Sequence, residues 1–253
     1  MNNILVSQLY AQGIFIKRLA ELPDDVGIEL YCETGNSFYW KYNLPVITKN
    51  WKRNISVHGP FSWINLADPA QSFSDIKNCY LECFDFCRTV NALHCVCHPD
   101  ADISKSYNRE KCFSIALKRL TELNSLATTN HINLLIENLP EKNSMFNYSV
   151  FTDYLLKETE CSFLLDAGHA IISGWNVIEY IETIGSRLKG IHVHEPVGGR
   201  DAHMPVGSGY YDWKDFFKAV KLYCQDANIV LEYESATDTE MRRSIDYINS
   251  LLQ

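Results

Sequence analysis

The stretch Ser162-Phe-Leu-Leu-Asp166-Ala-Gly-His169 is an apolar run that ends in a carboxylate, a glycine and a histidine. A short apolar run without polar alternation is typical of a strand that is buried on both faces in a parallel sheet. We therefore predict a strand over residues 162–167, followed by a turn toward a helix. Asp166 and His169 would lie at the carboxyl end of this strand.

Short apolar runs of the same kind recur along the chain, and longer segments of helical period separate them. Strands that alternate with helices in this way are typical of a parallel sheet. We expect strands over residues 4–7, 27–32, 55–59, 95–98, 133–138, 162–167, 190–194 and 229–233. We expect helices over residues 74–90, 108–129, 150–159, 177–187, 213–224 and 239–252.

Eight strand–helix units in 253 residues fit a closed (β/α)8 barrel, whereas an open doubly wound sheet normally has fewer strands. A nucleotide-binding alternative is weakened because no glycine-rich loop follows the first predicted strand. We therefore predict an α/β protein, a single (β/α)8 TIM-barrel domain over residues 1–253. Its active site should lie at the carboxyl ends of the strands, as in other barrels of this kind.

Composition limits the classes of function. The chain is 46% hydrophobic and 21% charged, which excludes a disordered or fibrous protein. Its net charge of −8 disfavours extended DNA binding, which requires a basic surface. We expect a cytoplasmic protein that does not contact a membrane, because the first residues lack a signal-peptide pattern and no apolar run is long enough to span a bilayer.

The 9 cysteines do not form a disulfide framework typical of small secreted domains, so we expect reduced thiols. Cys79, Cys83 and Cys87 fall on one face of a predicted helix, where they could form a soft metal site. Packing as small buried side chains is the interpretation we favour. A redox role for Cys95 and Cys97 is weaker, since both should point outward from their strand to the helices.

Ligand-type side chains recur at or just past the ends of predicted strands. Each of six strands contributes one of them: His58, His98, Glu137, Asp166, His192 and Glu232. The turns and loops that follow add three more, His169, Asp201 and His203. Imidazole and carboxylate groups suit zinc, manganese or iron(II), and so many ligands exceed the needs of one ion. We expect a cluster of two or three divalent metal ions, and zinc is the metal that we favour.

The remaining histidines are interpreted separately. His94 and His131 lie at the beginnings of their strands, on the face of a barrel that serves stability, and we assign no site role to them. His194 shares a strand face with His192. We interpret it as a residue that supports the ligands or contacts substrate, with direct ligation as the lesser alternative.

Seven motifs in order resemble a known family, the xylose isomerase-like barrels. These barrels include endonuclease IV, of AP endonuclease family 2, and the sugar phosphate isomerases and epimerases. The matching stretches are Val57-His-Gly-Pro-Phe61 with Ile64-Asn-Leu66, Cys97-His-Pro99, Ile136-Glu-Asn138, Leu165-Asp-Ala-Gly-His169, Ile191-His-Val-His-Glu195, Asp201-Ala-His-Met-Pro-Val-Gly-Ser-Gly209 and Leu231-Glu232.

The endonuclease IV pattern implies three zinc ions and phosphodiester hydrolysis by a metal-bound hydroxide. Glu137 would bridge two of the ions and orient the attacking hydroxide. The implied ligands are His58, His98 and Glu137 for one ion, Glu137, Asp166, His192 and Glu232 for the second, and His169, Asp201 and His203 for the third.

The isomerase and epimerase branch implies a single ion held by Glu137, Asp166, His192 and Glu232. Glu137 and Glu232 would then exchange protons beside a sugar carbonyl through an enediol. Arg200 and His169 would contact sugar hydroxyls or phosphate. The additional imidazoles of His58, His98 and His203 favour the hydrolase by a small margin, because an enzyme with one ion has less use for them.

Departures from endonuclease IV favour a small substrate that carries a phosphate or sugar group over DNA. The chain is shorter than is usual for endonuclease IV, and it is acidic. The loop after its third strand carries Trp63 without an evident DNA-probing segment. We expect substrate contacts from Arg200, His194, Phe61, Trp63 and Trp175, and Tyr210 also lies in a loop that follows a strand. A non-catalytic barrel with a structural metal is a minor alternative, and the oligomeric state cannot be inferred from the sequence.

Overall fold

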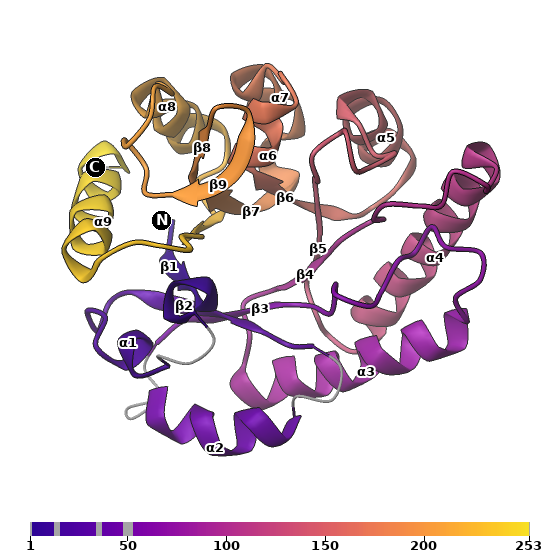
Figure 1. Ribbon diagram of the computed structural model, residues 1–253, viewed down its shortest axis with the longest axis horizontal. Coiled ribbons are helices and arrows are strands. Elements are labelled where there is room, and N and C mark those ends of the chain that lie inside the picture. Colours follow the sequence, from indigo (N-terminus) through magenta and orange to yellow (C-terminus); the bar gives the residue numbers. More distant parts are fainter. Residues whose placement is uncertain (1, 13–15, 34–36, 48–52, 253) are drawn as a thin grey trace.

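The computed structural model describes residues 2–12, 16–33, 37–47 and 53–252. Eight parallel strands close into a barrel in the order β1-β10-β7-β6-β5-β4-β3-β2, with helices around it (Figure 1). The strands are β1 Ile4–Ser7, β2 Gly27–Tyr31, β3 Ile55–His58, β4 Cys95–Cys97, β5 Leu134–Glu137, β6 Ser162–Asp166, β7 Leu188–Val193 and β10 Asn228–Leu231. The predicted (β/α)8 barrel is therefore confirmed.

The outer ring consists of helices that follow the strands. Those of two turns or more are α2 Ser37–Ile47, α3 Phe73–Val90, α4 Arg109–Thr129, α7 Val177–Ile184, α8 Trp213–Tyr223 and α9 Asp238–Leu252. Shorter helical segments are α1 Lys17–Ala20, α5 Leu156–Glu158, α6 Ala167–Ile172, two 3-10 turns (Gln8–Ala11 and Gly185–Arg187) and a π-helical turn (Val150–Leu155). No helix in the described ranges is long and apolar enough to cross a bilayer.

Side-chain caps define where the helices begin. The side chain of Ser72 accepts a hydrogen bond from the backbone N–H of Asp75, and Asn108 accepts one from Lys111. Such caps satisfy N–H groups that have no partner inside the helix. Asp166 caps α6 in the same way, so a carboxylate at the carboxyl end of β6 is fixed by the first turn of the next helix.

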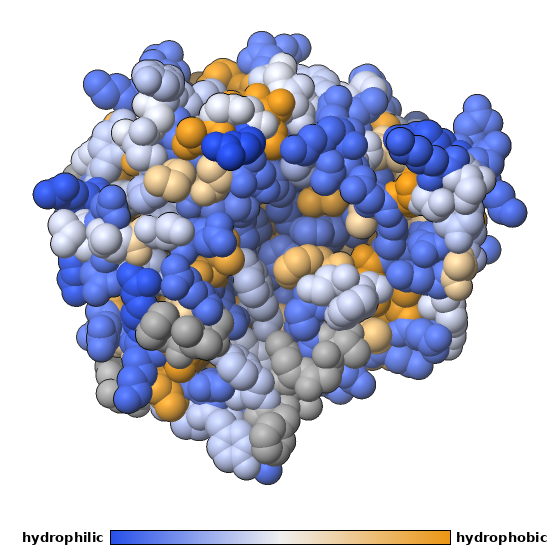
Figure 2. Space-filling model, in the orientation of Figure 1, coloured by the Kyte–Doolittle hydropathy of each residue, from blue (hydrophilic) through white to orange (hydrophobic). Residues whose placement is uncertain are grey.

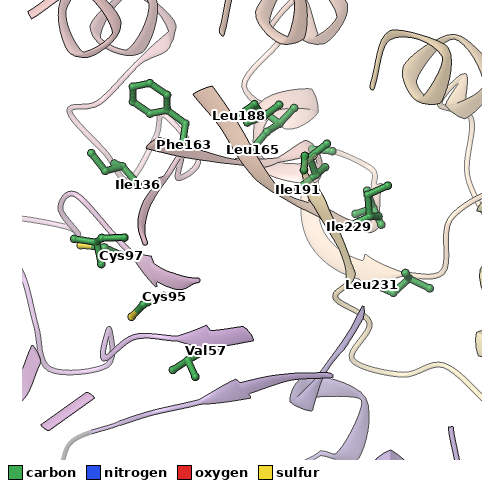
Figure 3. Packing of buried hydrophobic residues seen from close by; sticks show 14 of the residues in the cluster. Val57, Cys95, Cys97, Ile136, Phe163, Leu165, Leu188, Ile191, Ile229 and Leu231 are labelled. Atoms are coloured by element: carbon green, nitrogen blue, oxygen red, sulfur yellow. The ribbon is translucent and has the colours of Figure 1, made fainter. Parts of the chain in front are cut away.

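The apolar core has two parts. A large outer layer lies between the strands and the helices, and it contains Cys95 and Cys97 together with the other labelled side chains in Figure 3. A small inner cluster of Val96, Leu135 and Leu164 fills the barrel itself. The outward orientation predicted for the two cysteines is confirmed, because Val96 between them points inward. The inner cluster closes the barrel beneath its polar end.

The loop after β7 differs from the sequence-based expectation. It forms an antiparallel hairpin of β8 Glu195–Val197 and β9 Arg200–Met204, which packs beside α6. Buried Glu195 fixes the hairpin, since its carboxylate accepts hydrogen bonds from Trp213 Nε1 at 2.6 Å and from the backbone N–H of Tyr211 at 3.1 Å. The view in Figure 2 is hollowed over the middle of the barrel, and the residues around the hollow are largely hydrophilic.

Candidate metal centre

A central group of side chains lies at the carboxyl ends of β5, β6, β7 and β10. His192 is its focus. The Nδ1 atom of His192 lies 3.2 Å from Glu232 Oε2, 3.5 Å from Glu137 Oε1 and 3.8 Å from Asp166 Oδ2. All four residues are buried. Nδ1 has no hydrogen-bond partner among the described residues, although three carboxylates surround it. A buried nitrogen without a hydrogen-bond partner beside three carboxylates fits a ligand of a cation.

A second group shares Glu137 with the first. His98 Nε2 lies 3.1 Å from Glu137 Oε2, and His58 Nε2 lies 3.4 Å from the same oxygen. The other oxygen of Glu137, Oε1, faces His192. The two oxygens of one carboxylate therefore face two different sets of imidazoles. This is the arrangement that a carboxylate adopts when it bridges two ions.

A third group joins the first turn of α6 to the hairpin. His169 Nε2 lies 3.0 Å from Asp201 Oδ2, and His203 Nε2 lies 3.3 Å from Asp201 Oδ1. His194 Nε2 lies 3.5 Å from Asp201 Oδ1, and these four residues offer ligand atoms that all lie within 4.8 Å of one another. The hairpin β8–β9 thus contributes Asp201 and His203, which a strand-end pattern alone cannot place.

Three histidines are held in one orientation by backbone carbonyls. The Nδ1–H groups of His58, His169 and His203 lie 3.0, 3.0 and 2.9 Å from the carbonyl oxygens of Gly59, Asn138 and Glu232. A carbonyl only accepts, so Nδ1 carries a proton and Nε2 is left to face the carboxylates. Metal-binding histidines are commonly fixed in this way. The donor set therefore fits divalent metal ions.

The charges of the third group are strongly perturbed. Burial alone would lower the pKa of His169, but Asp166, Asp201 and Glu137 raise it to about 10. Burial would likewise lower the pKa of His203, and Asp201 and Glu232 raise it to about 9. Burial opposes ionisation of Asp201, but the two imidazoles bring its pKa well below the ordinary value. Protons on these imidazoles therefore compete with cations for the carboxylates.

The residues predicted to contact substrate fall in different surroundings. Phe61 packs against His58 and His98, with ring centroids 4.9 and 5.3 Å apart, so it borders the second group. Trp63 and Arg200 are exposed, Trp63 by 82%, and Tyr210 is also exposed.

His194 is fully buried, and its Nε2 lies 3.1 Å from Asp166 Oδ1. It therefore supports a ligand carboxylate from behind. Trp175 packs with Tyr148 and Tyr180 in the outer layer, and its indole N–H donates to Glu141 at 2.7 Å. The structure does not bring Trp175 to the histidine and carboxylate groups.

Sequence-based reasoning missed Glu29 and Tyr31, both on β2. Glu29 is fully buried, and its Oε1 lies 2.9 Å from His192 Nε2. The hydroxyl of Tyr31 donates to Glu232 Oε1 at 3.2 Å. The available signal was an acid within the apolar run Gly27-Ile-Glu-Leu-Tyr31, since an ionisable side chain rarely faces the inside of a barrel without a partner.

A group of thiols lies apart from the barrel mouth. Cys83, Cys87 and Cys95 place their sulfur atoms within 4.8 Å of one another, between α3 and the outer face of β4. Cys95 takes the place that the helical pattern suggested for Cys79, which is only half-buried. His131 is exposed, whereas His94 is buried and contacts Glu29 inside the barrel.

Known proteins share this architecture. Residues 41–251 match the model of the family described as xylose isomerase-like TIM barrel. The uncharacterized protein MJ1614 of Methanocaldococcus jannaschii is 22% identical over 227 residues, covering 89% of this chain and 88% of its own.

Solved structures with the same fold include epimerases and an AP endonuclease. A D-tagatose 3-epimerase-like protein has a TM-score of 0.79 at 22% identity, covering 99% of this chain and 97% of its own. D-psicose 3-epimerase from Clostridium cellulolyticum H10 has a TM-score of 0.77 at 15% identity, covering 99% of each chain. An AP endonuclease of family 2 from Brucella melitensis has a TM-score of 0.73 at 15% identity, covering 98% of each chain.

Proposed function

Because the chain belongs to the xylose isomerase-like TIM barrel family, we propose that it is a divalent-metal-dependent enzyme that acts on a small molecule carrying a phosphate or sugar group. The reaction we favour is hydrolysis of a phosphodiester at a cluster of two or three ions. The observation that carries this proposal is Glu137, whose Oε1 faces His192 while Oε2 faces His58 and His98. An enzyme with a single ion has no evident need for the second pair of imidazoles.

The ligand sets of the proposed cluster follow the three groups. Bound ions would lower the pKa of a coordinated water and neutralise the charge that develops on phosphate. Zinc is the metal we favour for so many imidazoles, and manganese or iron(II) would also suit these ligands. The sets are His58, His98 and Glu137; Glu137, Asp166, His192 and Glu232; and His169, Asp201 and His203.

The protein itself contributes fixed ligands and a bounded entrance. The carbonyl contacts of His58, His169 and His203 hold the rings before any ion binds, which reduces the cost of ordering them. Phe61 covers one side of the second group, while Trp63, in the loop after β3, and Arg200, at the start of β9, are exposed where a small substrate would reach them. The net charge of −8 disfavours an extended nucleic acid as the substrate.

The first test is metal content together with turnover. Protein purified without chelator or affinity-tag metal should contain two or three ions per chain and should hydrolyse bis(4-nitrophenyl) phosphate. His98→Ala should lose at least one ion and lower turnover by more than about 100-fold, since removal of a ligand exceeds the usual effect of removing an outer-shell partner. His131→Asn is the matched control. Full activity of His98→Ala would contradict the cluster.

Isomerisation or epimerisation of a sugar or sugar phosphate is the second candidate. Glu137 and Glu232 both face His192 Nδ1, at 3.5 and 3.2 Å, so two carboxylates flank one group. Glu137 would take a proton from the carbon beside a carbonyl, and Glu232 would return one. Solved 3-epimerases with the same fold add weight to this candidate.

Deuterium exchange distinguishes the two reactions. If the second candidate is correct, a ketose in heavy water exchanges the proton beside its carbonyl, and Glu232→Gln abolishes that exchange. His98→Ala leaves the exchange intact, because His98 belongs to the group that isomerisation does not use. Absence of exchange with wild-type protein across ketoses and aldoses removes this candidate.

A further inference from the structure

We infer that Glu29 is a positioning residue that selects the tautomer of His192 and thereby sets the affinity of the central group for its divalent ion. The inference rests on the metal-binding part of the proposed function, but not on which reaction the site performs. Glu29 reaches His192 from below, on the side away from the three carboxylates that face Nδ1. It is not one of the ligands discussed above.

Glu29 faces the inside of the barrel from the middle of β2. Its neighbours Ile28 and Leu30 belong to the outer layer, so the alternation of a strand directs Glu29 inward. Its Oε1 lies 2.9 Å from Nε2 of His192, and Ser56 donates to its Oε2 at 2.9 Å. The short contact with His192 is an ion-pair approach without hydrogen-bond geometry, and neither atom has another hydrogen-bond partner among the described residues. A carboxylate attracts a protonated nitrogen, so we assign a proton to Nε2 and the metal-binding lone pair to Nδ1. That lone pair faces Glu232, Glu137 and Asp166.

A chain of polar groups fixes Glu29 from beneath. The side-chain amide of Asn3 donates to Asn228 Oδ1 at 2.8 Å. The side-chain nitrogen of Asn228 is then left to donate to His94 Nδ1 at 3.0 Å. His94 Nδ1 is then an acceptor, so its proton is on Nε2, which lies 3.4 Å from Glu29 Oε2. His94 thus supports the site from the amino end of the barrel.

Burial of the Glu29 carboxylate lowers the stability of the fold unless the charge has a specific role. An ionised carboxylate taken fully out of water loses several kcal/mol of solvation, and replacement by an apolar residue of similar size is often neutral or stabilising. Burial opposes ionisation of Glu29, but its contacts with His192 and His94 hold its pKa below the ordinary value. A residue that served only to fill space here would be apolar.

Two variants and a control test the inference. Glu29→Leu removes the acceptor, Glu29→Gln keeps an acceptor oxygen but removes the charge, and Ser56→Ala removes a neighbour of Glu29 without touching His192. Zinc affinity is measured by competition with a chromophoric chelator. The tautomer of His192 is measured in metal-free protein by long-range proton–nitrogen NMR on histidine labelled with nitrogen-15.

The expected order of zinc affinity at the central group is wild type, then Glu29→Gln, then Glu29→Leu, with a total loss of roughly 10- to 100-fold. His192 should be protonated at Nε2 in wild type and should become a mixture of tautomers in Glu29→Leu. Ser56→Ala should retain both the tautomer and the affinity to within a few-fold.

An unchanged His192 tautomer in Glu29→Leu would overturn the inference, as would unchanged zinc affinity. If Glu29→Leu does not fold, Glu29→Gln decides, because equal zinc affinity in Glu29→Gln and wild type contradicts a role for the charge. The inference stands if wild-type protein binds zinc at His192 yet hydrolyses no phosphodiester, and in that case only the proposed reaction fails.

Discussion

Two regions of the molecule bring ligand-type atoms into coordination range, and they differ in what surrounds those atoms. At the barrel mouth, the histidines are oriented by carbonyl oxygens and by Glu29, and their free nitrogens face carboxylates. In the outer layer, Cys83 Sγ lies 3.6 Å from Cys95 Sγ, and Cys95 Sγ also lies 3.8 Å from the carbonyl oxygen of Val96.

The thiols are arranged as partners of one another. Contacts with neighbouring thiols, followed by burial, raise the pKa of Cys83 well above its ordinary value, so this sulfur stays protonated. The contacts with Cys83 and Cys95 lower the pKa of Cys87, so one thiol of the cluster serves as the acceptor for the others. A metal ion takes thiolates, and an apolar layer stabilises them poorly. We therefore expect that proximity of ligand atoms alone does not make the thiol cluster a metal site. Groups that orient the ligands and leave a lone pair free distinguish the barrel mouth from the thiol cluster.

The largest expected effect is that of removing the shared carboxylate. Glu137→Gln should lose the ions of both groups that Glu137 joins, and turnover should fall by more than about 100-fold. Metal content and the rate of phosphodiester hydrolysis measure this. Glu141→Gln makes the same chemical change outside the cluster and should retain both ions. Full metal content in Glu137→Gln would remove the bridging role.

Gly168→Ala should disturb the third group through packing alone. A Cβ at this position would lie 2.0 Å from Cε1 of His194, so the imidazole must move away from Asp166. We expect a loss of about 1–3 kcal/mol in the free energy of unfolding, as is usual for overpacked sites. Denaturant unfolding measures it. In Gly174→Ala only a positive φ opposes the change, so its loss should be smaller.

Cys83→Ala tests whether the thiol cluster, unlike the barrel mouth, holds no metal ion. Removal of one buried sulfur atom should cost about 1 kcal/mol of stability through the small cavity that it leaves. Metal content and turnover should not change. If the variant loses an ion that the wild type holds, the thiol cluster is a metal site and the distinction drawn above is wrong.

The smallest effect concerns pH. The folded metal-free protein holds protons on His169 and His203 with pKa values of about 10 and about 9, against an ordinary 6.5. Raised values stabilise the folded state fully below pH 6.5, and this contribution is lost as pH rises through 9 and 10. The thermal unfolding temperature of metal-free protein should therefore fall over that pH range, and it should fall less in His203→Asn. Zinc addition at pH 8 should release protons, and an indicator dye that detects none would contradict these values.

The sequence predicted the parts of the site that lie at strand ends. His58, His98 and His192 could be placed because the carboxyl ends of parallel strands meet at one edge. The role of Glu29 could not be predicted from the sequence, because it depends on which residue lies across the barrel from it. The thiol cluster required the same knowledge, since Cys95 reaches Cys83 from another element.

Loops were harder to predict than strands. Asp201 and His203 were expected in a loop, and the structure places them on a hairpin whose pairing leaves no strong local pattern. Trp175 was expected near substrate because its loop follows a strand, but an aromatic side chain in such a loop packs equally well against neighbouring helices. The expected span of a single domain and the role of each site residue stay predictions.

The closure of the barrel determines when the site can first exist. Residues Ile4 to Val6 of β1 pair with Ile229 to Leu231 of β10, so the first and last strands of the barrel are neighbours. Glu232 follows β10 directly, and it completes the group around His192. The group around His192 would therefore lack this ligand until the last strand of the barrel has been made and has joined β1. High-affinity binding at the central group would therefore report that the barrel has closed.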